Sequence, residues 1–220
     1  MSRPEAEVLR RAIRLYAITP DSLTRPEHYA AAVGVAVQAG VKVVQYRDKR
    51  DRSRAEKLAT ARLIADICER AGALCIVNDD PELAIEAGAH GVHVGPSDTA
   101  ASDVRNAFPD LLLGGSAGDV EAANALVSAG VDYLGVGAIF DARPTKANAS
   151  APRGTDVLQD LRAQPSLATI PIVAIGGITV ENARSCIEAG ADGVAAIRAI
   201  LGARDISAAI HSFNAALSNR

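Results

Sequence analysis

The chain has 220 residues, enough for one α/β domain with a sizeable core, and 49% of them are hydrophobic. The formal net charge of −3, with only four Tyr, three Phe and no Trp, excludes the basic, aromatic surface of a nucleic-acid-binding protein. The N-terminal residues are charged and unlike a signal peptide, and no apolar run approaches the roughly 20 residues that span a bilayer. Cys68, Cys75 and Cys186 are widely spaced, as expected of free thiols in a reducing compartment, so we predict a cytoplasmic protein.

Eight short apolar runs recur along the chain, and most of them end in polar or glycine-rich residues. In order they are LYAIT from Leu15, VKVVQYRDK from Val41, LCIVNDD from Leu74, GVHVGPSD from Gly91, LLLGGS from Leu111, DYLGVGAIF from Asp132, IPIVAIGGIT from Ile170 and GVAAIR from Gly193. Runs of this length and composition are typical of parallel strands buried on both faces.

The segments between the runs have helical patterning and commonly end in an Ala-Gly pair. These glycines are Gly40, Gly72, Gly88, Gly130 and Gly190. Glycine just past a helix ends it at little cost, and Asp119 and Thr179 are placed to cap the helices that follow them. Eight such units predict a (β/α)8 barrel forming a single domain over residues 1–220, with residues 1–13 as an N-terminal extension.

The second run ends in alternating polar residues that would share one side of a strand. These are Gln45, Arg47 and Lys49. Two cations and an amide at a strand end suit an anionic ligand, although a solvated charged turn is the alternative interpretation.

The third and fourth runs end in carboxylates. Asn78, Asp79 and Asp80 follow one run, and Asp98 follows the next. Oxygen ligands without a His/Cys cluster favour Mg²⁺, which commonly binds one or two carboxylates together with a phosphate. The alternative is that an aspartate, Asp98 above all, caps the following helix.

Later runs add candidate phosphate-binding groups. Ser116 follows the fifth run, Gly177 the seventh, and Ile197 and Arg198 the eighth, where barrel enzymes often bind phosphate through backbone amides. Gly-Ser is also an ordinary turn sequence. His93 lies inside an apolar run and is interpreted as a hydrogen-bonded core residue without a functional role. The long polar segment 140–155 is either a binding loop or a surface insertion, and its basic residues favour a binding loop.

At these residues the chain resembles the thiamin-phosphate synthase family (thiamin-phosphate pyrophosphorylase). The motifs that carry the resemblance run from Leu15 to Ile200 and are QYRDK, VNDD, GVHVGPSD, LGGSA, DYLGVGAIF, PTK, IPIVAIGGIT and AGADGVAAI. The resemblance implies a Mg²⁺-dependent transferase of thiamine biosynthesis, which joins hydroxymethylpyrimidine diphosphate to a thiazole phosphate and releases pyrophosphate.

The resemblance also implies a role for each matching position. Asp79 and Asp98 would hold Mg²⁺, and Arg47, Lys146 and Ser116 form the expected catalytic set. The pyrimidine diphosphate would contact Gln45, Tyr46, Arg47, Asp48, Lys49, Asn78, Ser116 and Lys146; the thiazole phosphate would contact Thr145, Gly177, Ile197 and Arg198. Small phosphorylated substrates are the expected partners, possible homo-oligomerisation is left open, and neither nucleic acid nor membrane is expected.

Two departures from the family pattern lie on the thiazole-phosphate side. The chain has ARPTK where relatives commonly have a compact T-x-T-K, and Arg198 where they typically have Ser. Two alternative functions follow: a thiazole tautomerase-like paralogue, and a non-catalytic barrel that binds phosphorylated ligands. Asp79, Asp98 and Lys146 argue against the tautomerase, because an isomerase has no diphosphate to bind.

Overall fold

A computed structural model describes residues 3–141 and 151–218 of the chain. Its eight strands are β1 (Leu15–Ile18), β2 (Val43–Tyr46), β3 (Leu74–Asn78), β4 (Gly91–Val94), β5 (Leu112–Ala117), β6 (Tyr133–Val136), β7 (Ile172–Ile175) and β8 (Gly193–Ala196). They pair in sequence order, all in parallel, and β8 pairs with β1 to close the barrel. The predicted (β/α)8 fold is confirmed.

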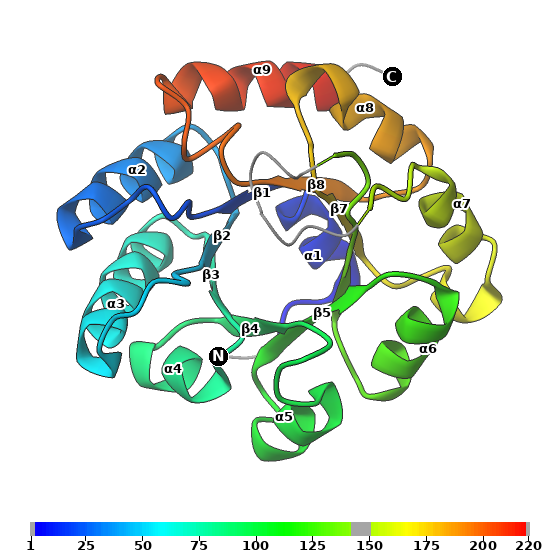
Figure 1. Cartoon of the computed structure of the whole chain (residues 1–220), viewed down its shortest axis with the longest axis horizontal. Coiled ribbons are helices and arrows are strands. Elements are labelled where there is room, and N and C mark those ends of the chain that lie inside the picture. Colours follow the sequence, from blue (N-terminus) through cyan, green and yellow to red (C-terminus); the bar gives the residue numbers. More distant parts are fainter. Residues whose placement is uncertain (1–2, 142–150, 219–220) are drawn as a thin grey trace.

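Helices α2 to α9 form a ring around the barrel, and α1 lies inside that ring (Figure 1). The helices are α1 (Ala6–Ala12), α2 (Pro26–Gln38), α3 (Arg54–Arg70), α4 (Pro81–Ala87), α5 (Ala101–Ala107), α6 (Val120–Ser128), α7 (Asp156–Arg162), α8 (Val180–Glu188) and α9 (Ile206–Ser218), with a 3₁₀ turn η1 at Pro165–Leu167. The predicted caps are present: Asp119 accepts a hydrogen bond from the Ala122 N–H, and Thr179 forms a capping box with Asn182. All five predicted stop glycines have positive φ.

Strand alternation divides the buried side chains into two groups. The larger group packs between the strands and the helices, and the smaller fills the barrel interior. The interior group comprises Leu9, Ile13, Tyr16, Ile18, Val43, Ile76, Leu112, Tyr133, Val173 and Ala195.

Two interior residues come from the segment before the first strand. Leu9 of α1 and Ile13 just after it are almost completely buried among the strand side chains, and α1 lies across the middle of the barrel in Figure 1. Leu9 and Ile13 of the predicted extension therefore form part of the core. Among the described residues, no helix is long and apolar enough to cross a membrane.

Candidate active site

The end of β2 directs two cations to the C-terminal mouth of the barrel. Gln45 points into the interior, as Val43 does, so Arg47 and Lys49 follow on the same side of the chain. The Arg47 guanidinium makes two contacts of 3.0 and 3.2 Å with the Asp21 carboxylate, and its side chain is only 12% exposed. Lys49 forms an ion pair with Asp79 of the next strand end. Gln45, Arg47 and Lys49 thus follow one another at the end of β2, and their grouping as an anion site stays a prediction.

Thr19 fixes the backbone at this point, and sequence reasoning missed it. Its hydroxyl is completely buried, donates a 2.9 Å hydrogen bond to the Arg47 carbonyl and accepts one of 2.8 Å from the Arg47 N–H. The Thr19 N–H also donates to the Gln45 carbonyl. Both main-chain groups of Arg47 are thereby held, which fixes where its side chain enters the mouth.

Tyr46 and Asp48 lie on the opposite face of the same segment. Tyr46 packs edge-on against Tyr29 in the layer between strand and helices. The Asp48 side chain is 1% exposed and bonded to Arg50 and Arg52. Burial raises the pKa of Asp48, but hydrogen bonds from Arg50 lower it more, so the net shift is downward. The structure therefore does not bring these two predicted substrate-binding side chains to the mouth, because successive strand residues point to opposite faces.

The carboxylates of Asp79 and Asp98 interact at the ends of β3 and β4. Asp79 has φ +70°, and its N–H donates to the His93 carbonyl. Burial raises the pKa of Asp79, as does the neighbouring Asp98, while Lys49 acts in the opposite direction. Two carboxylates held this close favour a bound cation.

Helix capping does not account for this pair. Asp80 caps α4 by accepting the Leu83 N–H at 2.7 Å, whereas Asp98 accepts the Gly95 N–H behind it in the chain. The N-cap position of α5 is Ala100, which makes no side-chain cap. The capping alternative for Asp98 is thus excluded. Asn78 ends β3 half-buried, in register with His93.

The Asp79 and Asp98 carboxylates fit a hard cation that takes few of its ligands from the protein. Within residues 3–141 and 151–218, no three His, Cys, Asp or Glu side chains are grouped as metal ligands. A pair of carboxylates, with water and substrate phosphate completing the coordination, matches the usual habit of Mg²⁺ rather than that of Zn²⁺.

Ser116 near the end of β5 is exposed and has a histidine partner. His93 Nε2 lies 2.9 Å from Ser116 Oγ, and the other ring nitrogen lies 3.1 Å from the Tyr133 hydroxyl. His93 is hydrogen-bonded inside the barrel, as expected, but it also contacts a predicted site residue. Sequence reasoning missed this link because β4 and β5 register side by side only in the folded barrel.

The residues predicted to bind the thiazole phosphate that the structure describes lie at the ends of β7 and β8. Gly177 has φ +63°, and a Cβ there would lie 2.7 Å from the Asp141 carbonyl oxygen and 2.8 Å from the Phe140 Cβ. Ile197 is half-buried and Arg198 exposed directly after β8. Glycine is therefore required at 177 both by its backbone conformation and by the close approach of the β6–α7 connection. Thr145 and Lys146 lie outside the described residues.

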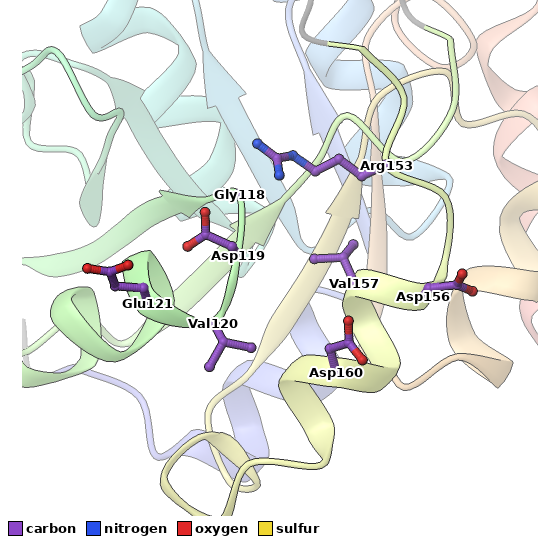
Figure 2. A pocket seen from close by; sticks show the side chains of 8 residues that line it. All are labelled: Gly118, Asp119, Val120, Glu121, Arg153, Asp156, Val157 and Asp160. Carbon is purple, nitrogen blue, oxygen red and sulfur yellow. The ribbon is translucent and has the colours of Figure 1, made fainter.

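A cavity of about 560 Å³ lies between the start of α6 and the start of α7 (Figure 2). The described residues that line it are Gly118, Asp119, Val120, Glu121, Arg153, Asp156, Val157 and Asp160. Arg153 packs over Gly118, and it is the one cation among four carboxylates in this described lining. None of the predicted site residues that the structure describes lines this cavity, and its acidic walls are unsuited to an anionic substrate.

The closed parallel barrel, with cations, paired carboxylates and a close-packed glycine at its C-terminal mouth, defines a barrel enzyme built for phosphorylated ligands. A family model described as thiamine monophosphate synthase matches residues 15–200, and the chain belongs to that family. The family and the predicted transferase class are confirmed.

Individual relatives agree over nearly the whole chain. Thiamine-phosphate synthase from Bacillus velezensis is 38% identical over 216 residues, covering 97% of this chain and 95% of the relative. The Chloroflexus aurantiacus thiamine-phosphate synthase is 42% identical, with 93% of each covered. Among solved structures, thiamine phosphate pyrophosphorylase from Pyrococcus furiosus superposes with a TM-score of 0.83 at 29% identity, covering 95% of this chain and 97% of that one.

Proposed function

We propose that the chain is a thiamine-phosphate synthase that joins hydroxymethylpyrimidine diphosphate to hydroxyethylthiazole phosphate and releases pyrophosphate, with Mg²⁺ as cofactor. The observation that carries the proposal is the Asp79–Asp98 pair beside Arg47 and Lys49 at the barrel mouth. A ligand that brings both phosphate and a divalent cation can bind the two carboxylates and the two cations together.

Each charged residue has a distinct part in this reaction. Asp79 and Asp98 would hold Mg²⁺, which would supply electrostatic stabilisation of the departing pyrophosphate. Arg47 and Lys49 would bind the diphosphate, exchanging their present partners Asp21 and Asp79 for phosphate oxygens.

The remaining polar groups position the two substrates. Gln45, Asn78 and Ser116 would contact the pyrimidine substrate, while Gly177, Ile197 and Arg198 border the place expected for the thiazole phosphate. No acid–base dyad is needed, because breaking the bond to pyrophosphate requires charge stabilisation and alignment of the attacking nitrogen. Lys146 and Thr145 belong to the same expected set. Tyr46 and Asp48 would act only indirectly, through the shape of the β2–α3 connection.

Product formation tests the proposal directly. The purified chain, mixed with both substrates and Mg²⁺, is expected to form thiamine phosphate, and omission of any one component should abolish it. Isomerisation of the thiazole phosphate without joining would favour the tautomerase. Ligand binding without any turnover would favour the non-catalytic barrel. A cytoplasmic location remains a prediction from the free cysteines and the charged N-terminal residues.

A further inference from the structure

Five polar side chains form a continuous hydrogen-bonded chain across the barrel interior. Gln45 Nε2 lies 3.0 Å from the Tyr16 hydroxyl, which lies 2.9 Å from the Tyr133 hydroxyl. Tyr133 continues to His93 Nδ1 at 3.1 Å, and His93 Nε2 reaches Ser116 Oγ at 2.9 Å. The chain, called here the interior relay, links five different strands. Its two ends are side chains assigned above to the pyrimidine substrate.

The middle of the interior relay is buried. Tyr16 and Tyr133 are almost completely inaccessible, and burial raises the pKa of both phenols above the usual value. Both hydroxyls are therefore neutral, and each can donate one hydrogen bond while accepting another. Ser116, in contrast, is exposed at the mouth.

Two glycines leave the space that the relay occupies. A Cβ on Gly114 of β5 would overlap the Tyr133 ring and His93 Nδ1. A Cβ on Gly135 of β6 would lie 2.9 Å from the His93 ring. β5 and β6 thus carry glycines, without side chains, where the His93 ring lies. In addition, the His93 carbonyl accepts the Asp79 N–H, which ties the same residue to the carboxylate pair.

The hydrogen bonds of the relay are mutually consistent in one direction from Gln45. The Gln45 amide nitrogen donates to the Tyr16 hydroxyl; with Tyr16 donating to Tyr133, Tyr133 in turn donates to His93 Nδ1. The imidazole proton then resides on Nε2 and is donated to Ser116 Oγ. As a consequence, the Ser116 proton is directed towards a ligand, and Gln45 keeps its carbonyl oxygen as an acceptor.

We propose that His93 is a positioning residue: through the interior relay it holds Ser116 as a hydrogen-bond donor and Gln45 as an acceptor for the ring of the first substrate. A heteroaromatic ring that offers both an acceptor nitrogen and an N–H donor, as an aminopyrimidine does, is the class of ligand that matches this polarity. The proposal rests on the proposed function, because that function assigns Ser116 and Gln45 to the pyrimidine.

The tautomer of His93 is the first test. In the full chain labelled with ¹⁵N-histidine, the imidazole nitrogens of His93, assigned by comparison with His93→Gln, are expected to show a neutral ring with the proton on Nε2. A proton on Nδ1 would make His93 the donor to Tyr133 and Ser116 the donor to His93, and would overturn the proposal. This measurement requires no substrate, so it decides the matter even if the wild-type chain forms no product. That absence of product would overturn the proposed function instead.

Binding measurements test the consequence for the substrate. Tyr133→Phe removes one hydroxyl from the relay and keeps the ring in place. It should weaken binding of the pyrimidine diphosphate about tenfold and leave binding of inorganic pyrophosphate with Mg²⁺ unchanged. Equal weakening of both ligands would point to general damage at the mouth and would overturn the proposal.

A pair of histidine variants provides a second, independent comparison. His93→Gln places an amide donor where Nε2 was and should retain most of the affinity, whereas His93→Asn is too short to reach Ser116 and should lose about tenfold. His90→Gln is the matched control, since His90 accepts the Cys75 N–H outside the relay. Equal affinity in the His93→Gln and His93→Asn variants would contradict the positioning role.

Discussion

Arg162 at the end of α7 ties the connections that lead into β7 and β8 together at the N-terminal end of the barrel. Its Nε donates to the Gly190 carbonyl at 2.7 Å, and one terminal nitrogen donates to the Ile170 carbonyl at 2.8 Å. The other terminal nitrogen pairs with Asp192, whose same carboxylate oxygen accepts the Ile172 N–H at 2.8 Å. Arg162→Ala would leave these acceptors without the guanidinium, so we expect a large loss of stability.

The size of the loss follows from how far the pair is shielded from water. Both side chains are 20% exposed, which places the ion pair between a surface pair and a buried one. With the hydrogen bonds to backbone carbonyls included, we expect Arg162→Ala to lower the free energy of unfolding by about 3 kcal/mol. For a chain of this length that corresponds to a fall in Tm of about 9 °C.

Equilibrium urea unfolding of the wild type and variants gives the difference directly. Arg11→Ala is the control, since Arg11 and Glu7 form an exposed pair with side chains 80% and 68% accessible, and it should cost less than about 0.5 kcal/mol. Arg162→Lys should fall between the two because it keeps the charge and loses the planar fork. A cost for Arg162→Ala within about 1 kcal/mol of the control would refute the reasoning.

The same arrangement occurs a second time, which allows an internal repeat of the experiment. Arg105 at α5 donates to the Gly130 carbonyl at 3.0 Å and pairs with Asp132 at 2.8 Å. The Asp132 carboxylate accepts the Leu113 N–H in turn. Arg105→Ala should therefore destabilise the chain by a similar amount.

Three further predictions concern the mouth. Asp98→Ala should lower Mg²⁺-dependent turnover at least about 100-fold while the urea midpoint stays near the wild-type value; near-normal turnover would disprove the metal assignment. Because the folded-state pKa of Asp79 is raised, its ionised carboxyl destabilises the metal-free fold above that pKa. Asp79→Asn should therefore raise the free energy of unfolding at pH 7. This gain should disappear as the pH falls towards the unfolded-state pKa of about 3.9. Urea unfolding across this pH range measures it, and a gain that grows as the pH falls would contradict the reasoning. Arg198→Ser should raise KM for the thiazole phosphate about tenfold and leave KM for the pyrimidine diphosphate unchanged, and equal changes in steady-state kinetics would remove Arg198 from the thiazole side.

The barrel was predictable because its signal is local and repeated. Each strand is a short apolar run, and the five glycines predicted to end helices all have positive φ. The residues at the mouth were predictable for the same reason. Once the strands are placed, Arg47, Asp79 and Asp98 must follow their C-terminal ends. The sequence pattern thus predicted these positions without any knowledge of side-chain contacts.

What the sequence could not provide are contacts between strands far apart in the chain. From the sequence, His93 is interpreted as a core residue. Only in the folded barrel do β4 and β5 lie side by side, which brings Ser116 within hydrogen-bonding distance of His93. The role of Thr19 is evident only in the folded barrel, where its hydroxyl bonds to the main chain of Arg47 at the adjoining ends of β1 and β2. Tyr46 and Asp48 matched a family motif as letters, but strand alternation directs them away from the mouth.

The two ends of the barrel differ in how their aspartate carboxylates are neutralised. This difference explains why we place the proposed reaction at the C-terminal mouth. At the N-terminal end, Asp192 pairs with Arg162 and accepts the Ile172 N–H, and Asp132 pairs with Arg105 and accepts the Leu113 N–H. Both carboxylates are therefore neutralised within the fold and need no ligand. At the mouth, Asp79 faces another carboxylate, and its ion pair with Lys49 offsets only part of the burial and repulsion that raise its pKa. Such repulsion lowers stability, and binding a divalent cation removes it. We therefore expect the stability given up at the mouth to increase its affinity for the proposed Mg²⁺, while the Arg162–Asp192 and Arg105–Asp132 ion pairs stabilise the far end of the barrel.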